Sequence, residues 1–144
     1  MEVWHLTPWI ELDVVLRLLI AAVMGGVIGY ERERASKPAG LRTNILVCMG
    51  AALFTITSIY GFAGLDAPAD PSRIAAGIVV GVGFLGAGVI LHSEKGVAGL
   101  TTAATVWSVA ALGLAVGCGL YLVAVVTAVL ILVALRLKTP WRHD

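Results

Sequence analysis

Apolar residues dominate five long stretches of the chain, and charged residues, Gly and Pro gather in the short segments between them. A helix that crosses a bilayer needs roughly 20 mostly apolar residues. The pattern therefore predicts membrane-spanning helices over residues 12–30, 41–62, 73–91, 101–116 and 120–137. Little sequence remains for anything else. We expect residues 1–144 to form one domain, an all-α polytopic membrane protein with the lipid bilayer as its surroundings.

The composition supports a membrane protein independently of the helix pattern. Hydrophobic residues make up 59% of the chain and charged residues 13%, whereas charged residues make up about a quarter of a soluble domain. The sequence contains no nucleophile–base set, no His/Cys cluster with metal-ligand spacing and no basic footprint for nucleic acid. We therefore expect neither an enzyme nor a nucleic-acid-binding protein, and no cofactor apart from the weakly bound Mg²⁺ considered below.

The positive charges predict the orientation in the membrane. Eight Lys and Arg residues lie in or beside three segments: the loop after the first predicted helix, the loop after the third, and the C-terminal tail. The segments expected on the other side of the membrane hold only Arg73. Cytoplasmic loops carry an excess of Lys and Arg. This asymmetry predicts an external N-terminus and a cytoplasmic C-terminus, as five spans require. The eight residues are Arg32, Arg34, Lys37, Arg42, Lys95, Arg136, Lys138 and Arg142.

Glycines recur at helical spacing. Gly25 and Gly29 form a small-xxx-small pair, a pattern that lets helix backbones approach each other in lipid. Residues 81–86 match G-x-G-x-x-G, but they lie inside an apolar span, so we reject a dinucleotide-binding loop. The third predicted helix is either tightly packed or locally broken at mid-membrane, and tight packing is favoured. Both packing within the chain and a homodimer interface remain open. The glycines of this helix are Gly81, Gly83, Gly86 and Gly88.

The most charged stretch is the predicted cytoplasmic end of the first helix, residues 31–34, where acids and bases alternate. One interpretation is a solvated, self-paired helix end with Glu31 and Arg34 at i,i+3, and such exposed pairs contribute only about 0–1 kcal/mol. The other is a docking or gating patch for a partner. Arg42 either extends its charge to the interface or pairs with Glu31 or Glu33. The patch comprises Glu31, Arg32, Glu33, Arg34, Arg42, Asn44, Thr101 and Thr102.

Helix starts explain several of the remaining polar residues. Thr101 is the predicted N-cap of the fourth helix, with an anion site at that N-terminus as the alternative. Asp70 before Pro71 predicts the start of the third helix, and Arg73 is a predicted partner of Asp70. The alternative places a weak Mg²⁺ site at Asp66 and Asp70, because Mg²⁺ binds through one or two carboxylates and retains water.

Arg17 is the one charged side chain well inside a predicted span. A charge in that position costs roughly 2.5–3.5 kcal/mol or more, so it needs a partner. Asp13, four residues earlier, lies on the same helix face and is the predicted partner.

Five separated segments together resemble the MgtC/SapB family of bacterial inner-membrane proteins. They are GVIGYERER (26–34), PAGLRT (38–43), RIAA (73–76), GFLGAGV (83–89) and GLTTAA (99–104). Gly77 and Ala98 depart from the family pattern. Longer members add a cytoplasmic C-terminal domain, and the resemblance implies a short form without it. The residues on motif positions are Glu31, Arg32, Arg42, Asp70, Arg73, Thr101 and Thr102.

The resemblance implies a role in adaptation to low magnesium, and in host cells for members from pathogens. Some family members restrain the F-type ATP synthase, which suggests a non-catalytic regulator that binds other membrane proteins. All nine acidic residues lie in loops or at span edges, whereas ion pathways usually carry ionisable residues inside the membrane, so the regulator is the favoured hypothesis. The alternative is a transporter or channel for Mg²⁺ or another ion, supported by the outer acids and the glycine-rich third helix.

Overall fold

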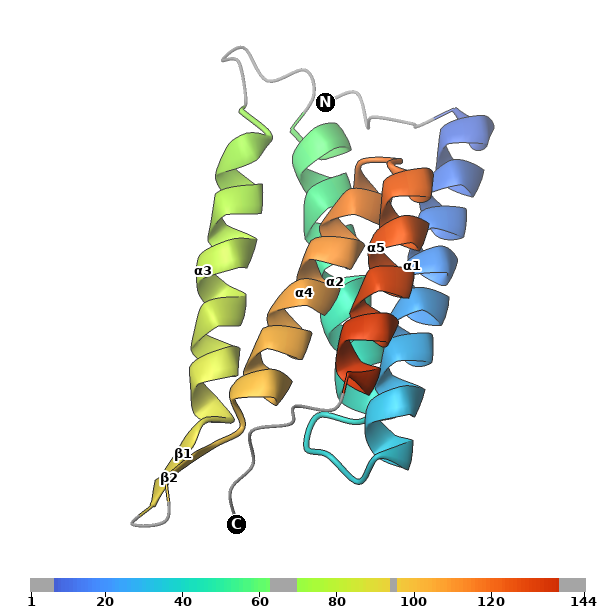
Figure 1. Ribbon diagram of the computed structural model, residues 1–144. Helices are drawn as coiled ribbons and strands as arrows, with labels where there is room; N and C mark the ends of the chain where they lie inside the picture. Colours follow the sequence, from blue (N-terminus) through green and yellow to red (C-terminus); the bar gives the residue numbers. More distant parts are fainter. Residues whose placement is uncertain (1–6, 63–69, 94–95, 138–144) are drawn as a thin grey trace.

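The computed structural model describes residues 7–62, 70–93 and 96–137, which form five helices and a short antiparallel hairpin (Figure 1). The helices are α1 (Pro8–Arg34), α2 (Leu41–Tyr60), α3 (Ser72–Gly88), α4 (Leu100–Gly117) and α5 (Tyr121–Arg136). The strands β1 (Leu91–Ser93) and β2 (Gly96–Ala98) pair between α3 and α4. Five helices were predicted, but the segment 92–99 was expected to be a plain loop and instead contributes to the hairpin.

The helix boundaries differ most at α1, which extends one turn beyond the prediction at both ends. At its start Pro8 occupies the first helical position, where proline has the right φ and its missing N–H is not needed. At its end residues 31–34 continue the helix, because Glu and Arg are good helix formers. The charged stretch is thus part of α1 and is held on a rigid element.

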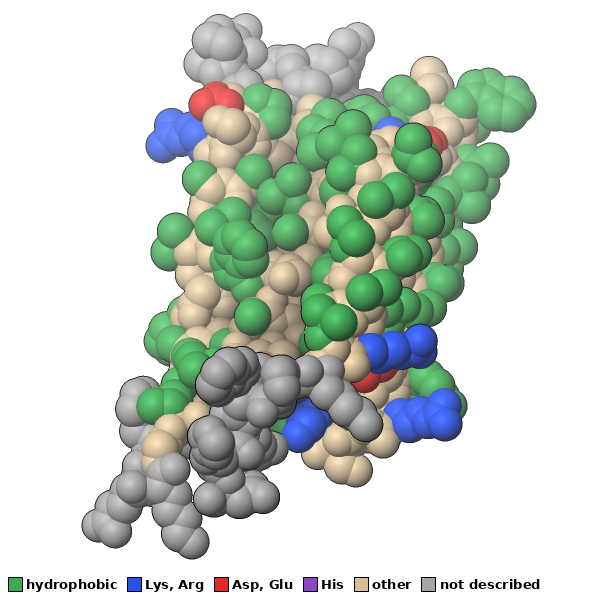
Figure 2. All heavy atoms as spheres, in the orientation of Figure 1, with side chains coloured by type: hydrophobic (Ala, Val, Ile, Leu, Met, Phe, Trp, Pro, Cys, Tyr) green, Lys and Arg blue, Asp and Glu red, His purple; other side chains and the backbone are tan. Residues whose placement is uncertain are grey.

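Three of the helices, α1, α2 and α4, are long and apolar enough to cross a membrane. The other two, α3 and α5, are apolar but shorter, with 17 and 16 residues. Apolar side chains cover the middle of the face seen in Figure 2, and charged side chains gather at its ends. We call the end where α1 finishes and α2 begins the Arg32 end, and the opposite end the Arg17 end.

The interior lies where α1, α2 and α4 pack together, with α5 against α1 and α4 (Figure 1). α3 stands at one edge and contacts α4 more extensively than α2. The central cluster is apolar and almost completely buried. Its members are Ala21, Ile28, Cys48, Ala52, Val109, Leu112, Val116 and Ala124.

Glycines bring these three helices into backbone contact. A Cβ at Gly25 would lie 2.5 Å from the carbonyl oxygen of Asn44, and a Cβ at Gly29 would lie 2.8 Å from the Cα of Leu41. On α4, a Cβ at Gly113 would overlap the carbonyl of Cys48. Small residues therefore determine how closely α1 and α4 approach α2, as the small-xxx-small pattern predicts for helices in lipid.

The glycines of α3 behave differently from the prediction. α3 is a continuous helix through all of them, so the locally broken helix is wrong. Nothing lies within 4 Å of a Cβ built at Gly81, Gly83 or Gly88, so tight packing within the chain is also wrong at these three positions. Gly86 alone is buried and faces Ala103 of α4 at an ordinary 3.6 Å. The edge position of α3 leaves its other faces without a neighbour.

We expect Gly113→Ala to destabilise the bundle, because the added methyl group forces α4 away from α2. Overpacking of this kind typically costs about 1–3 kcal/mol. The matched control is Gly83→Ala, which adds the same group in open space and gains helix propensity. Thermal unfolding of the purified protein in detergent checks this: Tm should fall for Gly113→Ala and hold or rise for Gly83→Ala. Equal Tm values for the two variants would contradict the packing argument.

Candidate functional site

Arg32, Asn44 and Thr102 are three buried polar side chains at the Arg32 end, contributed by α1, α2 and α4. Their exposed fractions are 4%, 0% and 3%. The Nη2 of Arg32 donates a hydrogen bond to the Thr102 hydroxyl at 3.4 Å, which joins α1 to α4. The helix packing around Gly25 and Gly29 thus brings together residues that lie 70 positions apart in the chain.

Arg32 carries a charge that the surrounding bundle does not neutralise. The long bond to Thr102 is the one side-chain hydrogen bond that Arg32 makes to the residues the structure describes, and its Nε has no partner there. No carboxylate of those residues lies within 4.0 Å of its guanidinium. Burying a charge without an opposite charge is costly. The Arg32 end therefore holds a buried guanidinium that is not paired with a carboxylate of the described residues.

Side chains also hold the connection between α1 and α2 in one conformation. The Nδ2 of Asn44 donates to the carbonyl oxygens of Ala39 and Gly40, at 2.5 and 2.8 Å. A carboxylate oxygen of Glu33 accepts a hydrogen bond from the N–H of Leu41 at 2.9 Å, which satisfies a free donor at the start of α2. The loop of residues 35–40, which carries one charge at Lys37, is therefore held in a fixed conformation.

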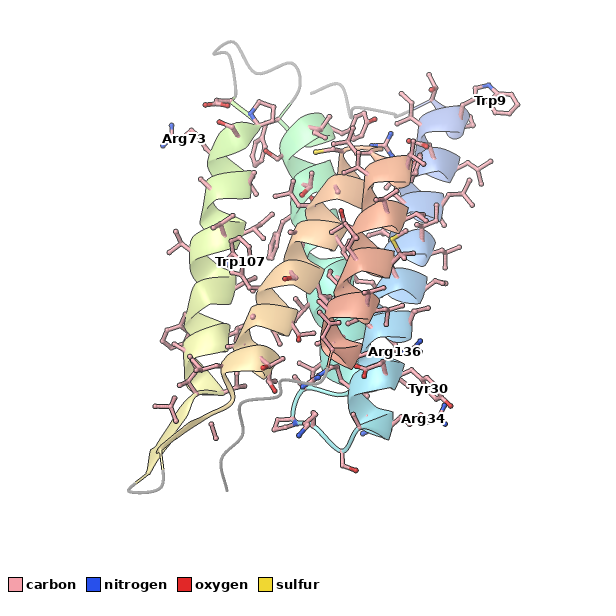
Figure 3. All side chains as sticks on the ribbon, in the orientation of Figure 1. Trp9, Tyr30, Arg34, Arg73, Trp107 and Arg136 are labelled. Carbon is pink, nitrogen blue, oxygen red and sulfur yellow. The ribbon has the colours of Figure 1, made fainter. Side chains whose placement is uncertain are left out.

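The self-paired alternative for this helix end is wrong, and so is the pairing of Arg42 with Glu31 or Glu33. In residues 7–62, 70–93 and 96–137, neither Glu31 nor Glu33 forms an ion pair with Arg34 or Arg42 within 4.0 Å. One oxygen of Glu31 is buried, whereas Arg34 is exposed and points outward from the bundle in Figure 3, so the two diverge. Glu33 caps α2 instead, and Arg42 is exposed.

The predicted N-cap at Thr101 is also wrong. α4 begins at Leu100, after Gly99, whose φ of +91° is in the left-handed region that favours glycine. A Cβ at Gly99 would overlap the Val89 carbonyl, so only glycine fits where the hairpin returns the chain beside the end of α3. Thr101 is exposed, and its carbonyl oxygen accepts a hydrogen bond from the Thr105 hydroxyl.

A second polar cluster lies at the Arg17 end. The predicted pair of Arg17 and Asp13 is present, at 2.6 Å between Nη2 and Oδ2. Arg17 also donates to the carbonyl oxygen of Gly117, at 2.6 Å, and lies 6.0 Å from the centre of the Tyr60 ring. The Tyr121 hydroxyl donates to Asp13 at 3.4 Å. The partners beyond Asp13 come from α2, α4 and α5, so spacing along one helix offered no signal for them.

The start of α3 differs from the prediction by one residue. The helix begins at Ser72, and Asp70 accepts a hydrogen bond from the Ser72 N–H at 2.9 Å. Hydrogen bonding to Ser72 holds the pKa of the Asp70 carboxyl below its usual range, with a smaller contribution from the nearby charge of Arg73. The two charges do not form an ion pair within 4.0 Å, and both residues are exposed.

The candidate Mg²⁺ ligands are only partly placed. Asp70 is described, whereas Asp66 lies outside the described residues. Within the described part of the chain, His, Cys, Asp and Glu form no group of three or more that could hold a metal ion. Of the two candidate ligands, the structure thus places only Asp70, an exposed carboxylate at the Arg17 end.

Two arginine substitutions distinguish the two clusters. Arg32→Met keeps the side-chain length and removes a buried charge that has no counter-charge, so we expect a Tm equal to or above that of the unmodified protein. Arg17→Met leaves Asp13 and the Gly117 carbonyl without their donor, so we expect a lower Tm. Thermal unfolding in detergent measures both. An equal loss of stability in the two variants would show that Arg32 is as structural as Arg17.

Comparison with known proteins adds a family assignment to this geometry. Protein SapB of Bacillus subtilis (strain 168) is 43% identical over 143 residues, which are 96% of this chain and 60% of that protein. Protein MgtC of Salmonella typhimurium (strain LT2) is 46% identical over 120 residues, 83% of this chain and 50% of that protein. No solved structure gives a significant match.

A protein of Escherichia coli (strain K12) named "Putative magnesium transporter YhiD" is 48% identical over 128 residues, 86% of this chain and 60% of that protein. The chain thus spans 50–60% of the length of these curated relatives. The model of the MgtC family matches residues 18–143, nearly the whole sequence. The chain therefore belongs to the MgtC family of membrane proteins.

Proposed function

We propose that this chain is a non-catalytic regulator that binds other membrane proteins during adaptation to low magnesium. The observation that carries the proposal is the apolar core between the two polar clusters. Cys48, Val109 and Leu112 fill it with exposed fractions of at most 1%, and the glycine contacts bring the helix backbones together around it. An ion that crosses one copy of this bundle would have to open that packing, whereas a docking protein uses only the ends and the outer faces.

The proposed docking surface is the charged rim at the Arg32 end, which we define as the exposed residues Glu33, Arg34, Arg42 and Thr101. Neither Arg34 nor Arg42 is neutralised by an ion pair within the described residues. Asn44 and Glu33 hold the connecting loop in place, so little conformational entropy is lost when a partner binds. Arg32 beneath the rim adds a further uncompensated positive charge.

This chemistry favours a partner with an acidic segment at the membrane surface. Oppositely charged surfaces steer association and select the partner. The excess of Lys and Arg in this set of loops supports a cytoplasmic rim on a protein with five spans in the bacterial inner membrane. Among the partners that the family resemblance implies, the F-type ATP synthase is the first to test.

A second candidate function is Mg²⁺ transport, which is favoured by the printed name of the E. coli relative. In this chain Asp70 is the residue that suits it. Its low pKa keeps the carboxylate ionised, and hard oxygen ligands of this kind bind Mg²⁺. A single carboxylate would hold the ion weakly and leave most of its water shell in place.

Site-specific photocrosslinking in native membranes tests the regulator. A photoreactive side chain at Thr101, an exposed residue of the rim, should capture a discrete partner, and the double variant Arg34→Glu, Arg42→Glu should reduce capture by about tenfold through like-charge repulsion with an acidic partner. The matched control is the same probe at Leu130 of α5, an exposed apolar position that should capture lipid. Identical products from the two positions would contradict docking at the rim.

Ion flux tests the second candidate. Sealed liposomes with the purified protein are compared with empty vesicles and with liposomes containing Asp70→Asn. If the regulator proposal is correct, Mg²⁺ entry should match that of empty vesicles for both forms of the protein. Entry that depends on the protein and is lost in Asp70→Asn would replace the regulator with a transporter and place its mouth at the start of α3.

A further inference from the structure

An open apolar groove runs between α2 and α3, away from both polar clusters. Its volume is about 640 Å³. α3 contacts α4 more than α2, which leaves this side of the edge helix uncovered (Figure 1). Lining residues include Gly50 and Phe54 of α2 and Arg73, Gly77, Gly81 and Leu85 of α3.

The wall on α3 is one continuous helix face. Arg73, Gly77, Gly81 and Leu85 follow one another at intervals of four residues, so they lie in a row along the helix, and all four are exposed. Nothing lies within 4 Å of a Cβ built at Gly77 or Gly81. This row is wide enough and flat enough for the backbone of a further helix to approach it.

The opposite wall repeats the feature. On α2 nothing lies within 4 Å of a Cβ built at Gly50, and Leu46 and Phe54 lie one turn before and after it. Neighbouring helices of the same chain occupy the space beside the glycines of α1 and α4, whereas the space beside the groove glycines is open. The groove thus has the form of a helix-packing site whose helix lies outside the chain.

We propose that the groove receives α3 of a second copy of this chain in a two-fold symmetric dimer. Two copies inserted with the same orientation are related by an axis along the membrane normal, so their α3 helices run parallel and equivalent residues lie at equal depth. Each α3 then lies against Gly77 and Gly81 of the other and enters the other groove. Such an interface is isologous and closes on itself.

Charge selects this occupant over others. Arg73 is the one charged side chain among the groove-lining residues, and it has no ion pair within 4.0 Å in the described chain. Asp70 lies two residues before the start of α3, and its carbonyl oxygen accepts a hydrogen bond from the Arg73 N–H at 3.2 Å. A parallel second copy therefore brings its Asp70 to within one turn of the depth of Arg73, and the symmetry forms this pair twice. An anionic phospholipid whose acyl chain fills the groove offers a counter-charge to Arg73 but none to Asp70, whereas the dimer supplies a partner for both charges.

The proposal concerns a different face from the charged rim, so it does not depend on the proposed function. Its test is the oligomeric state of the full chain in lipid. Cys118 is exposed and Cys48 is buried, so a maleimide dye labels Cys118. Energy transfer between donor-labelled and acceptor-labelled protein in vesicles, measured over a series of dilutions with lipid, reports the dimer.

Gly81→Leu and Gly83→Leu form a matched pair for this assay. Both positions have open space in the monomer, so both variants should fold, but only Gly81 lines the groove. Leu at position 81 occupies the space that the second helix needs, so we expect association about tenfold weaker or more, with Gly83→Leu near the unmodified protein. Energy transfer unchanged in Gly81→Leu, or reduced equally in both, would overturn the proposal.

Charge reversal identifies the occupant. Asp70→Arg and Arg73→Glu should each weaken their own dimer, because each places like charges across the two-fold axis. A mixed dimer of the two variants forms one Asp–Arg pair and one Glu–Arg pair. In an equimolar mixture, mixed dimers should therefore exceed the statistical proportion. A monomeric unmodified chain at every dilution, or a mixture without enrichment, would leave the groove to a lipid acyl chain or a helix of another protein and would overturn the proposal.

Discussion

The close approach of α1, α2 and α4 is the constraint on which the rest of the structure depends. In lipid the tails are as apolar as the side chains, so helices associate through close packing rather than through exclusion of water. Gly25 and Gly29 allow α1 to lie on the backbone of α2, and Gly113 allows α4 to do the same at Cys48, beside α1. The remaining helices pack around this trio.

The polar clusters at the two ends follow from that packing. At the Arg17 end, Arg17 is partnered by Asp13, by a backbone carbonyl and by a tyrosine ring, so this cluster joins four helices. At the Arg32 end, Arg32 is more deeply buried than Arg17 but has one long hydrogen bond and no ion pair within 4.0 Å among the described residues. Stability explains the first arrangement. The second holds a buried charge at a cost in stability, which packing alone does not explain.

The glycines of this chain fall into two groups, which differ in whether a neighbouring helix occupies the space beside them. Gly113 on α4 touches a neighbouring backbone, whereas Gly77 and Gly81 on α3 face open space beside the groove. The exposed Arg73 at the same groove has no ion pair within the described chain. Packing within the chain therefore accounts for the first kind of glycine, and for the second we propose an interface with a second copy.

The sequence by itself determined the number of helices, their approximate limits and the Asp13–Arg17 pair. These features depend on apolar length and on residues three or four positions apart, which are visible in one dimension. Only the tertiary structure decided that Arg32 and Thr102 meet, that Glu33 caps α2 and that the glycines of α3 are uncovered. Contacts between helices depend on which faces turn toward each other. In lipid both the packed and the lipid-facing sides of a helix are mostly apolar, so the sequence pattern does not distinguish one side from the other.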